Sequence, residues 1–135
     1  GVTARKDVVA LRFSSDGGVS DQALSMLAAG GLTPCFVCAA GGGGTWMVFS
    51  RTDNLALDGF LTASLPEGAT LVKDIGAVTV VGDVLADPSG PAAISHVRSI
   101  GHLRGMMLAP AAMTLLVDAD KVDSVTRELH EVFFA

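Results

Sequence analysis

The chain has 135 residues, enough for one compact domain or two very small ones. Half of the residues are apolar, 17% are charged, and the formal net charge is −5. The basic residues are scattered and form no patch, so we expect neither nucleic acid nor an anionic membrane surface as a partner. Because polar surface is scarce, we expect some apolar surface to be buried against a second copy, in a homodimer.

Membrane and export signals are not visible in the sequence. No apolar run approaches the roughly 20 residues that span a bilayer. The basic pair Arg5-Lys6 is followed at once by Asp7, which does not fit a signal peptide. With two cysteines and no export signal, we expect a cytoplasmic protein with reduced thiols.

The first predicted elements are a strand and a helix. Residues 7–15 are apolar and partly β-branched, which predicts a strand. Ser20 is a suitable helix cap, and Asp21 would place a negative charge in the first turn, where the helix dipole favours it. The pair Gly30-Gly31 predicts the end of this helix.

A hairpin, a second helix and a short strand follow. Residues 35–40 and 45–51 are apolar runs on either side of four glycines, which predicts two strands joined by a flexible turn. Asn54 is expected to cap the second helix, and residues 70–73 form a short strand. The order is therefore strand, helix, strand, strand, helix, strand.

The same order of elements then starts again. Residues 77–81 predict a strand, a helix follows from Pro91 to about residue 100, and residues 103–109 and 113–118 form a second hairpin. The last helix begins near Asp120. Its apolar side chains recur at helical spacing and form one stripe: Val122, Val125, Leu129, Val132 and Phe133.

This internal repeat predicts two units in tandem, residues 1–74 and 75–135. The second unit lacks a fourth strand, whereas residues 2–5 have no role in the first. We therefore predict that residues 2–5 are donated as a strand to the second unit. The expected fold is α+β, with two ferredoxin-like βαββαβ units interlocked through the N-terminal strand.

Several segments of the second half resemble a known family. Residues 77–82 (A-V-T-V-V-G) and 87–93 (D-P-S-G-P-A-A) resemble the start of the second ACT unit in the regulatory part of aspartate kinases. Residues 115–118 (L-L-V-D) and 127–133 (R-E-L-H-E-V-F) resemble its end. The resemblance implies ACT units that pair, usually across a dimer, and bind lysine or threonine at their seams. It also implies an aspartate kinase catalytic domain as a partner, on the same chain or a separate one.

The candidate effector site is the loop before the first helix. Backbone N–H groups ahead of a helix suit a carboxylate, Asp16 could pair with an amino group, and the next strand start would close the pocket. In the second unit, Pro91 removes one N–H donor from the corresponding place. The expected effector-binding residues are Asp16, Gly17, Gly18, Val19, Ser20, Thr33, Pro34 and Cys35.

The sequence gives little support for redox-active thiols, a metal site or a phosphate-binding loop. Cys35 and Cys38 form a C-x-x-C on a predicted strand, not at a helix N-terminus, so we expect buried, inert thiols. The three histidines fall in separate elements, and no metal site is expected. Residues 41–44 lack the Lys-Ser or Lys-Thr and the helix of a phosphate loop, and no cofactor is expected.

The sequence fits three functions to different degrees. A catalytic nucleophile motif and the glycine-rich K-F-G-G-type motif of the kinase half are absent, so this chain alone should not phosphorylate aspartate. The leading function is an effector-binding regulatory module. The alternative is a structural dimerisation pair that has lost its effector, because Asp16-Gly17-Gly18 lacks the proline of the family's D-x-P-G loop. A small enzyme on the same scaffold is the third.

Overall fold

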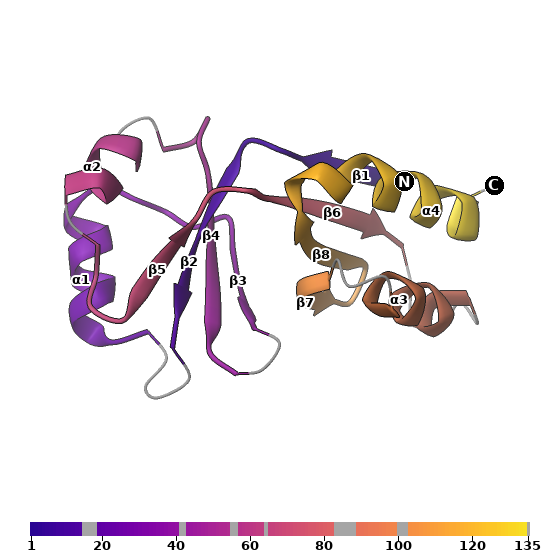
Figure 1. Ribbon diagram of the computed structural model, residues 1–135, viewed down its shortest axis with the longest axis horizontal. Helices are drawn as coiled ribbons and strands as arrows, with labels where there is room; N and C mark the ends of the chain where they lie inside the picture. The colour runs from indigo at the N-terminus through magenta and orange to yellow at the C-terminus, as the bar shows by residue number, and fades with distance from the viewer. Residues whose placement is uncertain are drawn as a thin grey trace. The chain divides into compact units, whose positions relative to one another are not determined.

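The computed structural model describes residues 1–14, 19–40, 43–54, 57–63, 65–82, 89–99 and 103–134. The chain divides into two compact units (Figure 1). The inserted unit is contiguous and covers Asp7–Lys73. The terminal unit combines Gly1–Lys6 with Asp74–Ala135. The chain therefore passes from one unit to the other twice.

The inserted unit is a four-stranded antiparallel sheet with two helices. Its elements, in chain order, are β2 (Val8–Phe13), α1 (Asp21–Ala29), β3 (Phe36–Ala39), β4 (Thr45–Ser50), α2 (Leu57–Ala63) and β5 (Ala69–Val72). The strand order is β3-β4-β2-β5, which is the ferredoxin-like arrangement. Alternate residues of β2 and β4 point to one face, and both helices cover that face (Figure 1).

Local signals explain where α1 begins and ends. The Ser20 hydroxyl accepts a hydrogen bond from the Ala23 N–H at 3.1 Å, which confirms the predicted cap. Gly30 donates its N–H to the carbonyl of Met26 at 3.0 Å, and Gly31 has a φ of 72°. A left-handed residue at this place is the usual end of a helix.

The terminal unit repeats the same fold with one strand taken from the N-terminus. Its elements are β1 (Val2–Arg5), β6 (Ile75–Val81), α3 (Ser89–Ser99), β7 (Leu103–Ala109), β8 (Ala112–Asp118), the 3-10 turn η1 (Ala119–Lys121) and α4 (Val122–Phe134). The strand order is β1-β6-β8-β7. Strand β1 therefore occupies the place that β5 has in the inserted unit.

The pairing predicted for the N-terminal strand is confirmed. Val2 lies opposite Val80 and Arg5 opposite Ala77, in antiparallel register. The Gly1 carbonyl extends the ladder by accepting the Val81 N–H at 2.9 Å. Val2 also packs against the core of the unit. The tandem, interlocked α+β fold follows from this pairing.

The core of the terminal unit lies between its sheet and its two helices. Val78, Val80 and the inward-facing residues of β8 are buried against α3 and α4. Val122, Val125 and Leu129 of the predicted stripe are buried, as expected. Val132 differs, because it is 41% exposed. It lies near the end of α4, where the helix borders a pocket.

The glycine run in the β3–β4 hairpin has a structural reason that the sequence did not reveal. Gly43 and Gly44 have φ values of 100° and 88°, which other residues rarely adopt. A Cβ on Gly44 would overlap the backbone carbonyl of Phe13. Glycine is therefore required here and not merely tolerated. Residues 41–42 lie outside the described ranges.

Candidate functional site

The structure describes only part of the loop that was predicted to bind the effector. Asp16, Gly17 and Gly18 lie outside the described residues. Val19 packs against the core of the inserted unit, and the Ser20 hydroxyl caps α1. These two residues hold the start of α1 in place, at the position where a carboxylate was expected to bind.

The second part of the predicted site, Thr33 to Cys35, makes internal hydrogen bonds. The Thr33 N–H donates to Asn54 Oδ1 at 2.9 Å, and Asn54 Nδ2 donates to the Thr33 carbonyl at 3.2 Å. The Cys35 N–H donates to the Val48 carbonyl at 2.8 Å. These backbone groups therefore serve the fold. Thr33 and Cys35 are exposed and Pro34 is half-buried, so the surface they present is made mainly of side chains.

Asn54 has a role in the fold beyond the helix cap that the sequence predicts. Its backbone carbonyl accepts the Leu57 N–H at 3.0 Å, which places Asn54 at the start of the segment that enters α2. Besides Thr33, the side chain donates to the carbonyl of Ser50 at 2.9 Å. Asn54 is only 5% exposed, and a buried amide needs such partners. It joins the end of β4 to the segment before β3, a contact across 21 residues that sequence spacing could not show.

The two cysteines are not equivalent. Cys38 is buried, as expected, but Cys35 is exposed. The prediction of two buried thiols was therefore wrong for Cys35, because residues three apart on extended backbone point to opposite faces. In the described ranges, no group of three His, Cys, Asp or Glu side chains could hold a metal ion. None of the described helices is long and apolar enough to cross a membrane.

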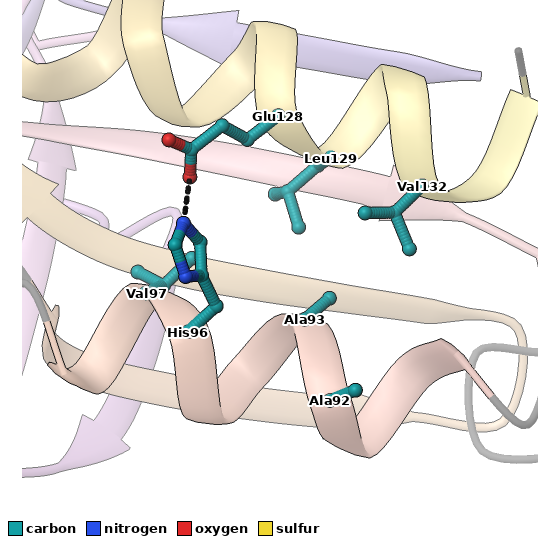
Figure 2. A pocket seen from close by; sticks show the side chains of 7 residues that line it. All are labelled: Ala92, Ala93, His96, Val97, Glu128, Leu129 and Val132. Atoms are coloured by element: carbon teal, nitrogen blue, oxygen red, sulfur yellow. Dashed lines mark ion pairs between the residues drawn. The ribbon is translucent and has the colours of Figure 1, made fainter.

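A pocket of about 450 Å³ lies between α3 and α4 in the terminal unit (Figure 2). Its walls are mostly apolar and come from both helices: Ala92, Ala93 and Val97 from α3, and Leu129 and Val132 from α4. Two polar side chains, His96 and Glu128, complete the lining. The pocket thus combines an apolar trough with one polar pair.

The polar pair lies at one end of the trough. His96 Nε2 and Glu128 Oε2 are 3.3 Å apart and point toward each other from the two helices (Figure 2). The separation exceeds the 2.7–2.9 Å or so of a good charge-assisted hydrogen bond. Glu128 Oε2 is buried and makes no hydrogen bond within the described part of the chain. It is a carboxylate oxygen with unused accepting capacity.

Sequence reasoning missed this site. The sequence alone does not single out Glu128, and His96 is one of three histidines in separate elements. One signal was available in the sequence. Each of the two polar residues is the direct neighbour of an apolar residue that is buried, His96 of Val97 and Glu128 of Leu129. A polar residue at the edge of a buried stripe borders whatever that stripe packs against.

No protein-family model and no curated protein sequence matches the chain. Solved structures do match. A chain in the structure of aspartokinase alpha and beta subunits has a TM-score of 0.74 and 18% identity, over 100% of this chain and 98% of that one. The ligand-free regulatory subunit of aspartate kinase from Thermus thermophilus has a TM-score of 0.71 and 21% identity, over 98% and 97%.

A longer aspartokinase chain matches as well. Escherichia coli aspartokinase III, in complex with lysine and aspartate, has a TM-score of 0.66 and 14% identity. The match covers 99% of this chain and 32% of that one. The fold implied by the residue resemblance is therefore confirmed. Along nearly its whole length, the chain has the tandem ferredoxin-like fold found in the regulatory subunit of aspartate kinase.

Proposed function

We propose that this chain is a non-catalytic regulatory module of an aspartate kinase. The main support for this proposal is the coverage of the match to the Thermus thermophilus regulatory subunit, which is 98% of this chain and 97% of that subunit. A fold that matches a regulatory subunit from end to end leaves no room for an additional kinase domain within these residues. The expected partner is a cytoplasmic aspartate kinase catalytic domain, on the same chain or a separate one.

The proposed effector is an amino acid of the lysine or threonine class, bound at a seam between units. The Escherichia coli relative was solved with lysine and aspartate, which supports this class. The proposed contacts are residues 16–20, ahead of α1, together with Thr33, Pro34 and Cys35. A helix start favours the ligand carboxylate, and Asp16 would take the amino group.

We expect an effector to raise the melting temperature of the full chain. With an assumed Kd of about 0.1 mM, about 5 mM ligand stabilises the folded state by about 2.3 kcal/mol, which is a shift of several degrees. A thermal-shift screen of the common amino acids, lysine and threonine first, checks this. The shift should disappear in Asp16→Ala and persist in the control Asp53→Ala, which changes an exposed aspartate of the same unit.

The structural alternative rests on a specific observation. Asn54 and Val48 already occupy the backbone groups of Thr33 and the N–H of Cys35, which a ligand at this strand start would otherwise use. A folded, dimeric chain whose melting temperature responds to no amino acid would favour a dimerisation pair that has lost its effector.

We also expect a homodimer. Strand β3 is an edge of its sheet and carries Val37, which is 44% exposed, and an open apolar edge is a ready surface for pairing. Light scattering at roughly tens of micromolar should give twice the 13.7 kDa of one chain. Val37→Lys should shift the mass toward the monomer. Leu24→Lys, at a similarly exposed position on α1, should not. A monomeric wild-type chain at these concentrations would refute the dimer.

A further inference from the structure

The pocket between α3 and α4 has the size and lining of a small-molecule site. Its volume of about 450 Å³ falls within the range of roughly 300–1,000 Å³ that ligand pockets occupy. Ala92 and Ala93 leave the α3 wall shallow, and Leu129 and Val132 form the opposite wall. Val132 continues the buried stripe of α4 yet stays 41% exposed, so the trough presents apolar surface to whatever enters it.

The polar end of the pocket offers one acceptor and one donor. Glu128 Oε2 is buried without a hydrogen bond in the described residues, which is a costly arrangement for a carboxylate oxygen. A ligand N–H would satisfy it with a charge-assisted bond. The imidazole of His96, 3.3 Å away at Nε2, can donate to an anion through a ring N–H in its neutral or its protonated form.

The placement of polar and apolar side chains along the pocket selects the shape of the ligand. Figure 2 shows His96 and Glu128 together at one end and Ala92 and Val132 toward the other. A ligand must therefore carry an ammonium and a carboxylate close together and an apolar chain extending away from both. A second charge at the tip of that chain would be placed against Ala92 and Val132, and the described lining residues at that end include no polar side chain.

We propose that this pocket binds an α-amino acid with an apolar side chain, of the size of leucine, methionine or phenylalanine. The ammonium donates to Glu128 Oε2, the carboxylate accepts from His96, and the side chain lies in the trough. The site belongs to the terminal unit alone. It is therefore separate from the proposed effector site, and its existence does not depend on that site.

The test is a ¹⁵N NMR titration of the whole chain with L-leucine. The expected result is a set of saturable shifts in the amides of α3 and α4. Two matched probes report on the polar contacts: 4-methylpentanoate lacks the ammonium, and 3-methylbutylamine lacks the carboxylate. Each should bind about tenfold more weakly or worse, because a hydrogen bond to a charged group contributes about that factor.

Three variants test whether leucine occupies this pocket. Glu128→Gln keeps the shape of the side chain and removes its charge, and Ala92→Leu fills the apolar end from an exposed helical position. Both should weaken leucine binding about tenfold or more. Glu131→Gln is the control, because Glu131 is an exposed residue of α4 that does not line the pocket. It should bind leucine as the wild type does.

Each contrary result has a distinct meaning. Leucine shifts confined to Val19, Ser20 and residues 33–35 would overturn this pocket while supporting the proposed effector site. Unchanged binding in Glu128→Gln, or no shifts with leucine, methionine or phenylalanine, would overturn it as well. Shifts of α3 and α4 that depend on protein concentration alone would instead assign the groove to a second copy of the chain.

Discussion

Deletion of residues 1–6 unfolds the terminal unit and leaves the inserted unit folded. The deletion removes β1, the whole of its ladder with β6, and the contact of Val2 with the core. Lost hydrogen bonds and apolar burial of this extent cost about 3–5 kcal/mol. A single core in a unit of fewer than 70–80 or so residues rarely supplies more than that. The missing strand is therefore decisive for this unit.

Hydrogen–deuterium exchange checks the result unit by unit. Amides of β8 around Leu115, which is fully buried, should lose protection, while those of β4 around Val48 should keep it. Equal loss of protection in both units would show that the two unfold together. Retained protection in β8 would show that β1 contributes little to the stability of the terminal unit.

A pair of proline variants tests the same strand without truncation. Gly1 exchanges hydrogen bonds with Val81, and bonded positions alternate along an antiparallel ladder, so Thr3 should donate to β6 whereas Ala4 should not. Thr3→Pro should cost the terminal unit about 2–3 kcal/mol, because it deletes a ladder donor and leaves an acceptor unpaired. Ala4→Pro should be tolerated, because proline fits an edge strand where its nitrogen faces outward.

Gly44→Ala should destabilise the inserted unit by about 3 kcal/mol or more. Two costs combine. The φ of 88° is unfavourable for alanine, and the new Cβ would overlap the carbonyl oxygen of Phe13. That oxygen is backbone at the end of β2, so no side-chain rotation can relieve the overlap. Chemical denaturation followed by the fluorescence of the single tryptophan, Trp46 in β4, measures the change.

Gly59→Ala is the matched control for this glycine. Gly59 lies within α2, and a Cβ there would meet nothing within 4 Å. Alanine should therefore stabilise the unit by about 0.5–1 kcal/mol, through its higher helix propensity. A Gly44→Ala variant as stable as the wild type would show that the hairpin can rearrange around the new methyl group.

The order of elements and the placement of β1 could be predicted because both rest on patterns within the chain. Apolar runs next to glycine or proline indicate most of the strands. The repeat then leaves the second sheet one strand short and residues 2–5 without a partner strand. Counting strands was enough to assign residues 2–5 to the sheet of the second unit. The structure adds the register, in which Val2 lies opposite Val80.

The contacts of the candidate site residues could not be predicted in the same detail. The roles of Asn54 and Glu128 depend on which backbone or side-chain groups meet them across the fold. Spacing along the chain places Glu128 beside a buried residue, but it does not show which groups of another element lie opposite. Asn54 follows a strand and precedes a helix, which is the pattern of a cap, but that pattern does not show the hydrogen bonds of its buried side chain to Thr33 and Ser50. Glu128 has the sequence pattern of a surface residue because it is charged and follows Arg127, while the groove it borders is formed with α3.

The insertion of one unit within the other has a consequence for the order of folding. All strands of the inserted unit lie within residues 7–73, so it can fold as soon as that segment leaves the ribosome. Strand β1 is made before the inserted unit but must wait for β6, and closing so long a loop is entropically slow unless its middle is already compact. Folding of the inserted unit shortens the effective loop. We therefore expect the terminal unit to form after the inserted unit during synthesis, with β1 unpaired until β6 is available.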